Sequence, residues 1–342
     1  MLSSLTDLDA TVYLCRKPLW NAIALTGTLC GYYGGTALLL SANAWLNGLG
    51  VFLLTYSLAL TVFWAHEFMH DSVFKKRQAN TIAGNIVLWL NGGCYARFRE
   101  LKRWHIAHHV KHAEFSTVDV EDLIQKLPTV ARRLILLLEG LYFPAIAFLL
   151  QWRALTAPFW NPQRHDERLR VVVLLLLRGT MFTALGILSP KAVILYFLSY
   201  TGMHVVTQFT GAFFHTYETF RPDEIAPKRD QDYEQANTFS YVLSHRYVWL
   251  NFLLLNCGYH NAHHIMMQCP WHNLHQLDQT LNSRYGETED CFIDLLQMFK
   301  NYHRFRMNRV LAGCGQSRDD EGHLQLQTFY GCIGFSDIVL PV

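Results

Sequence analysis

The sequence carries little charge. Charged residues make up 16% of its 342 positions, whereas a soluble globular domain averages about 25%. Hydrophobic residues reach 51% and the formal net charge is only +2. This composition excludes a disordered chain, which needs low hydrophobicity and high net charge. It also lacks the basic footprint of a nucleic-acid-binding protein, so we expect no nucleic-acid partner.

The cysteines lack the spacing of a metal site. None of the eight forms a C-x-x-C pair, so the sequence does not predict a thiolate zinc site. They are also scattered rather than arranged as a disulfide framework, and we expect reduced thiols. Histidine, in contrast, is abundant, with 17 copies.

Residues 18–65 contain no charged side chain, a run of 48 positions. That length predicts two membrane spans of about 20 residues each, joined at Ser41-Ala-Asn-Ala-Trp-Leu-Asn47. A buried hairpin of a soluble protein is the alternative. It is disfavoured because soluble helices seldom run this long without a charge.

Three further apolar stretches cover residues 134–152, 171–188 and 192–214. If all three crossed the membrane, the histidine clusters before and after them would lie on opposite faces. We therefore expect only the last two to span, as a hairpin that turns at Ser189-Pro190-Lys191.

Two charged residues interrupt these stretches. Glu139 lies in the first, which arginines flank on both sides, a pattern that predicts an amphipathic helix in the membrane interface. Arg178 lies inside the third predicted span. It either snorkels or pairs with Glu139.

The sequence thus predicts an all-α membrane protein. It has four transmembrane helices in two hairpins, an interfacial helix and a cytosolic helical cap that carries the histidine clusters. Residues 1–17 form a cytosolic N-terminal segment, 18–307 the membrane domain and 308–342 a cytosolic tail. Residues 66–133 hold eleven Lys or Arg, whereas the opposite loops hold only Lys191. The positive-inside rule therefore places both termini and the histidines on the cytoplasmic side.

Three histidine boxes recur along the chain: His66-Glu-Phe-Met-His70, His105-Ile-Ala-His108-His109 and His260-Asn-Ala-His263-His264. On a helix, positions i, i+3 and i+4 share one face. Imidazole is the commonest metal ligand, and eight histidines exceed the three or four that one zinc takes. We therefore expect two metal ions, although nitrogen donors suit Fe, Zn, Cu and Ni alike. A proton relay or core histidines are the alternatives.

The boxes, their order and their placement beside the apolar hairpins resemble the integral-membrane fatty acid desaturase superfamily. The resemblance covers roughly residues 20–281 and is most specific at His66–Asp71, at Trp104–His109 and at Gly258–His264. It implies a di-iron centre held by histidines, O2 as co-substrate, and two electrons from a small redox carrier. Such a centre removes hydrogen from an unactivated C–H bond.

The resemblance also implies the ligands. They are His66, His70, His105, His108, His109, His260, His263, His264 and, near the end of the last span, His215. His204 lies deeper in that span, and we expect it to be a hydrogen-bonded intramembrane histidine. His112 follows the second box, and its role as a ligand stays open.

Neighbouring residues allow further predictions. Glu67 and Asp71 either orient imidazoles or are solvated charges at the helix end. No His-Pro-Gly-Gly sequence of a fused cytochrome occurs, so we expect a separate electron donor of the ferredoxin, rubredoxin or cytochrome b5 type. The basic residues Lys75-Lys76-Arg77 and Lys102-Arg103 either dock that carrier or reflect membrane topology alone.

The predicted function is desaturation of a lipid acyl chain at the membrane surface. A hydroxylase or ketolase of the same superfamily is the first alternative, because it would use the same ligands. A histidine-bearing membrane zinc protein is the second.

Overall fold

The computed structural model describes residues 9–116, 118, 120–221, 224–285, 292–311, 329 and 331. The predicted N-terminal segment is therefore described only from Asp9 onward. Most of the predicted tail, residues 308–342, lies outside the described residues, and so these two boundaries stay predictions.

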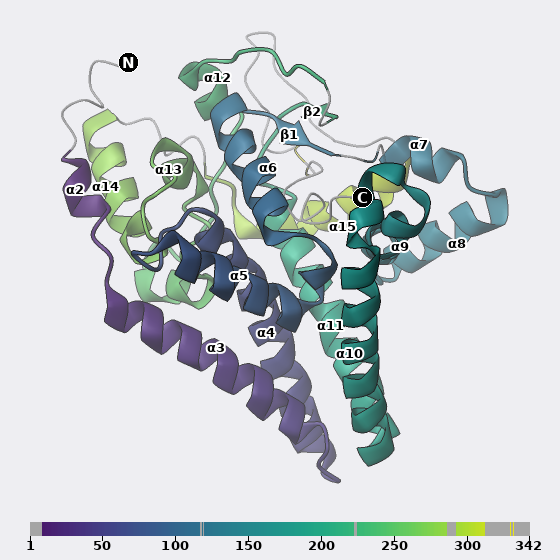
Figure 1. Cartoon of the computed structure of the whole chain (residues 1–342). Helices are drawn as coiled ribbons and strands as arrows, with labels where there is room; N and C mark the ends of the chain where they lie inside the picture. Colours follow the sequence, from purple (N-terminus) through teal and green to yellow (C-terminus); the bar gives the residue numbers. More distant parts are fainter. Residues whose placement is uncertain are drawn as a thin grey trace.

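Helices dominate the described chain (Figure 1). The α-helices are α2 (Ala10–Tyr13), α3 (Pro18–Leu38), α4 (Ala44–Met69), α5 (Arg77–Asn91), α6 (Phe98–Lys111), α7 (Val120–Gln125), α8 (Thr129–Gly140), α9 (Ala145–Trp160), α10 (Arg168–Leu188), α11 (Pro190–Gly211), α12 (Gln231–Ala236), α13 (His260–Ile265), α14 (Leu274–Tyr285) and α15 (Leu295–Leu311). Short 3-10 helices are η1 (Gly93–Tyr95), η2 (Pro162–Glu167), η3 (Val248–Leu254) and η4 (Trp271–Asn273), and the strands are β1 (Glu114–Phe115) and β2 (Thr219–Phe220).

Helices α3 and α4 form the first hairpin. The Asn47 side chain closes its turn by donating to the carbonyls of Leu38 and Ser41, at 2.9 and 3.0 Å. Near the turn the two backbones approach closely, since a Cβ on Gly35 would lie 2.9 Å from the Leu54 nitrogen. Small residues permit this close packing, which matters in lipid because the hydrophobic effect does not drive helices together there.

Helices α10 and α11 form the second hairpin, and its turn lies where the sequence predicted it. Ser189 separates the helices and caps α11 by accepting a hydrogen bond from the Ala192 N–H at 3.2 Å. The Lys191 ammonium then donates to the Asn47 side-chain oxygen at 2.8 Å. The turns of the two hairpins therefore meet, at the bottom of the view in Figure 1.

Helices α4 and α11 run in parallel away from these turns. Thr55 on α4 donates to the Ser199 carbonyl on α11 at 3.3 Å. A Cβ on Gly202 would lie 2.9 Å from the Thr55 side chain, so the helices are in close contact. His66 at the end of α4 and His215 just after α11 consequently emerge at the same end of the hairpins.

Three described helical segments are long and apolar enough to cross a membrane: Ala44–Met69, Pro162–Leu188 and Pro190–Gly211. Helix α3 has 21 residues and no charge, but asparagine, threonines and tyrosines interrupt its apolar run. It is not among the three. The mostly helical fold is confirmed, whereas the four-span arrangement stays a prediction.

The predicted interfacial helix over residues 134–152 is not one helix. It divides into α8 and α9 at Pro144, because the proline ring disfavours helical geometry in the preceding residue. Tyr142 adopts a positive φ of 63° at this break. Glu139 is fully buried and forms an ion pair with Arg306 of α15 at 2.7 Å.

Arg306 is the residue that forms the ion pair with Glu139. The alternative in which Arg178 pairs with that carboxylate is therefore wrong. Arg178 instead donates to the Trp89 carbonyl at the end of α5. Its guanidinium also lies over the Trp89 ring, 5.5 Å from the centroid.

A two-stranded parallel sheet joins the ends of α6 and α11. Strands β1 and β2 pair Glu114 with Thr219 and Phe115 with Phe220. Each strand follows a helix that carries or precedes predicted ligands, so this pairing fixes the second histidine box beside the segment of His215.

Candidate metal centre

The second histidine box lies on one face of α6. His105, His108 and His109 occupy the i, i+3 and i+4 positions of this helix, which lie together on its surface. All three are buried. The spacing in the sequence therefore does place three imidazoles on the inner face of one helix.

The first box lies at the end of α4. His66 is in the last turn of that helix and His70 is its C-cap. The His70 and His105 Nε2 atoms lie 2.6 Å apart. The first two boxes, which are 35 residues apart in sequence, therefore face each other directly.

The third box forms the short helix α13, which Gly258 brings close to its neighbour. A Cβ on Gly258 would lie 1.9 Å from the Tyr241 carbonyl oxygen, a space that only glycine leaves open. His260 Nε2 lies 2.8 Å from His215 Nε2. The segment after α11 thus meets the third box, as the resemblance implied.

The imidazoles divide into two groups. One ring nitrogen from each member lies within 4.8 Å of the others in its group. The first group is His66, His70, His105, His109 and His263, and the second group is His108, His215 and His264. His260 contacts the second group through His215. All nine predicted ligands therefore converge, and they do so around two points.

Burial favours the neutral form of eight of the nine imidazoles. It lowers the pKa of His108 to about 3. Burial, with neighbouring imidazoles adding to it, lowers the pKa well below its usual range for His70, His105, His109, His215, His260, His263 and His264. Neutral imidazole is the form that binds metal.

A buried carboxylate orients the second group. Glu234 of α12 accepts from His264 Nδ1 at 2.9 Å, and its other oxygen lies 3.5 Å from His112 Nε2. A carboxylate on one ring nitrogen of a histidine leaves the other nitrogen for a metal. Among the described residues, His112 lies in neither group and contacts Glu234 instead.

Further contacts orient the other two rings of the second group. His108 Nδ1 lies 3.0 Å from the Ala113 carbonyl and 3.6 Å from a Glu114 oxygen. His215 Nδ1 lies 3.4 Å from the Thr238 hydroxyl. In each ring Nδ1 is held by the protein and Nε2 faces inward.

The acidic neighbours of the first box behave differently from each other. Glu67 is buried, lies 3.4 Å from His66 Nδ1, and accepts from Ser72 at 2.7 Å. Asp71 instead forms ion pairs with Lys102, at 2.6 Å, and with Arg77, at 3.7 Å. Glu67 thus has the position of an orienting carboxylate, and Asp71 does not.

His204 makes the hydrogen bond expected of an intramembrane histidine. Its Nε2 lies 3.0 Å from the side-chain nitrogen of Gln151 on α9, and it belongs to neither group. The contacts of Glu234 with His264 and of Glu114 with His108 were not predicted from the sequence. Both glutamates lie in polar segments outside the boxes, and only the chain fold brings them to the imidazoles.

The residues present fit metal ions. Among the described residues, neither ring nitrogen of His263 has a hydrogen-bond partner, and neither does Nε2 of His264, although all three atoms are buried. Unpaired buried polar atoms are costly unless something binds them. Their convergence in two groups matches two histidine-bound ions, and neutral nitrogen donors suit first-row transition metals.

Comparison with known proteins agrees with this geometry. The sequence model of the family described as fatty acid desaturase matches residues 43–290. No curated protein sequence matches the chain. The family match includes all three histidine boxes and His215, and it extends over more than half of the chain. The chain therefore belongs to the fatty acid desaturase family.

Proposed function

We propose that this protein is a membrane-bound, O2-dependent fatty acyl desaturase that holds two iron ions. The observation that carries the proposal is the convergence of nine histidines, eight of them in two groups and His260 in contact with the second, in a chain of the fatty acid desaturase family. The family supports a lipid acyl substrate and an oxidoreductase reaction. The introduction of a double bond, rather than a hydroxyl, is our proposal.

Each group would hold one ion. The first ion takes its ligands from the first group, and the second ion takes His108, His215, His260 and His264. When bound, two iron ions supply the oxidising chemistry that removes hydrogen from an unactivated C–H bond. Neutral imidazoles add no negative charge, so the protein leaves such a centre strongly cationic.

The chain itself excludes water from the centre. Eight of the nine imidazoles are buried, and His66 alone is partly exposed. The aromatic rings of Tyr217 and Phe214 stack on His215 and His260, with centroids 4.3 and 3.9 Å apart. A dry site strengthens electrostatic interactions and protects reactive species from side reactions.

Electrons would arrive from a separate small carrier at the histidine end of the molecule. Lys75, Lys76, Arg77 and Arg103 are exposed there. Lys102 belongs to the same surface and is tied to Asp71, the residue that follows His70. This surface suits an acidic ferredoxin, rubredoxin or cytochrome of the b5 type, and the proposed topology places it on the cytoplasmic side.

Fatty acid profiling of a bacterial host that expresses the chain tests the proposal. We expect new monounsaturated acyl chains in its lipids, and none when the host carries His263→Ala at equal expression. Hydroxylated or oxidised chains without new double bonds would favour the hydroxylase or ketolase and contradict desaturation. An unchanged fatty acid profile, together with a purified protein that contains zinc, would contradict both the desaturase and the hydroxylase or ketolase.

A further inference from the structure

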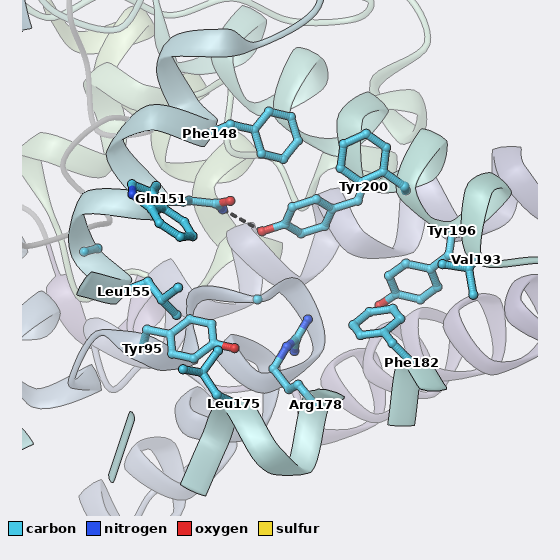
Figure 2. A pocket seen from close by; sticks show the side chains of 14 residues that line it. Tyr95, Phe148, Gln151, Leu155, Leu175, Arg178, Phe182, Val193, Tyr196 and Tyr200 are labelled. Atoms are coloured by element: carbon cyan, nitrogen blue, oxygen red, sulfur yellow. Dashed lines mark hydrogen bonds between the residues drawn. The ribbon is translucent and has the colours of Figure 1, made fainter. Parts of the chain in front are cut away.

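A cavity of about 440 Å³ lies among α9, α10 and α11 (Figure 2). Its wall is mainly aromatic and aliphatic, with Phe148, Leu155, Leu175 and Phe197 among the lining residues. Cavities of this size and character bind small molecules. Two of the three helices are membrane-span candidates, so the ligand that reaches the cavity is one that dissolves in lipid.

The wall of the cavity contains the buried cation Arg178. This residue is 8% exposed and lies ten residues after the start of α10, about 15 Å along the helix. It donates to the Trp89 carbonyl and lies over two aromatic rings. Within the described part of the chain, no carboxylate forms an ion pair with Arg178.

Other polar groups at the cavity are also donors. Tyr200 accepts a hydrogen bond from the Gln151 amide at 2.6 Å, which leaves its own hydroxyl proton to donate. Figure 2 shows the Tyr95 hydroxyl directed toward Arg178. The cavity therefore offers a cation and a hydroxyl donor in an apolar enclosure, and an ionisable residue at this depth marks a functional site with a partner.

We propose that this cavity binds a fatty acid, with the carboxylate on Arg178 and the acyl chain along the apolar wall. A carboxylate would give Arg178 the anionic partner that the described residues do not supply. Arginine pairs with a carboxylate through two parallel hydrogen bonds. A single acyl chain suits the volume of the cavity. Leu176 and Leu177 are exposed on α10, which lies in a candidate membrane span.

This site is distinct from the metal centre. Tyr200 precedes Gly211, the last residue of α11, by eleven positions, which is about 16 Å along the helix. The binding of a fatty acid here involves neither metal nor turnover. Its failure would leave the proposed desaturase function untouched.

Equilibrium binding of radiolabelled palmitate to the full chain in phosphatidylcholine nanodiscs tests the proposal. Hexadecane and methyl palmitate serve as uncharged comparison ligands. We expect palmitate to bind the wild type at least tenfold more tightly than either, and Arg178→Leu to weaken palmitate at least tenfold, because hydrogen bonds to a charged partner are lost. Hexadecane binding should stay within twofold.

Matched variants separate the cavity from general charge effects. Arg133→Leu removes a cation from the exposed face of α8 and should leave palmitate binding unchanged. Arg178→Lys keeps the charge but loses the two parallel hydrogen bonds, so it should bind palmitate more weakly than the wild type and more tightly than Arg178→Leu. Leu155→Trp fills the cavity and should weaken both palmitate and hexadecane at least tenfold.

Three results would overturn the proposal: palmitate binding that survives Leu155→Trp, palmitate that binds no tighter than methyl palmitate, or equal palmitate binding by Arg178→Leu and the wild type. If Arg178→Leu does not fold, the Leu155→Trp variant and the comparison with the uncharged ligands still test whether the cavity binds a fatty acid.

Discussion

The two groups of imidazoles differ in how the protein holds them. In the second group, each Nδ1 has an oxygen partner: the Ala113 carbonyl for His108, the Thr238 hydroxyl for His215 and the Glu234 carboxylate for His264. In the first group, Nδ1 of His70, His109 and His263 is buried and has no hydrogen-bond partner in the part of the chain that the structure describes.

This difference separates two ways of building a metal site. The first group relies on helix geometry, since α4, α6 and α13 carry its members at fixed spacing. The second group relies on neighbours from the loops and from α12, which fix the ring orientation and raise ligand basicity. Substitutions of orienting residues should therefore affect the second group more than the first.

Loss of a ligand from either group should have the largest effect. We expect His263→Ala in the first group and His264→Ala in the second to abolish turnover and to lower the bound iron from about two ions per chain to about one. Metal analysis of the purified variants and fatty acid profiling check this. His165→Ala removes an exposed histidine and should leave both values unchanged. Retained activity in both ligand variants would contradict the ligand assignment.

Loss of the orienting carboxylate should have the next largest effect. In Glu234→Gln, His264 loses its carboxyl partner, and outer residues of this kind typically contribute 10–100-fold in metal affinity or activity. We expect a loss in that range and depletion of one ion only, measured by chelator titration. Glu224→Gln alters an exposed glutamate and serves as the control. Equal loss of both ions would show that the two groups are not held independently.

The corresponding change beside the first group should have the smallest effect. Glu67 lies 3.4 Å from His66 Nδ1, longer than a good hydrogen bond. An amide oxygen at this position can still accept from Ser72 and from the Trp271 N–H. We expect Glu67→Gln to lower metal affinity by less than about fivefold. A larger loss than that of Glu234→Gln would reverse the comparison between the groups.

The sequence predicted which histidines converge, because that information is local. The H-x2-H-H spacing at His105 and at His260 needs only helix geometry to aim the rings. The hairpin turn at Ser189 is likewise marked by a capping serine before a proline. Pro144 indicates the break between α8 and α9. The apolar residues on both sides of it favour one continuous helix, and so the break is missed from the sequence.

The remaining features depend on tertiary contacts. Glu234 reaches His264 only because α12 folds back over the third box. The acceptor of Arg178 is a backbone carbonyl on α5, and every residue has such a carbonyl. No spacing rule in the sequence distinguishes either partner from its neighbours.

The most direct test of the central claim is the metal content of the chain, purified from membranes and measured by inductively coupled plasma mass spectrometry. Two groups of histidines that serve a desaturase should bind about two irons per chain. One zinc per chain, with no iron, would contradict the claim.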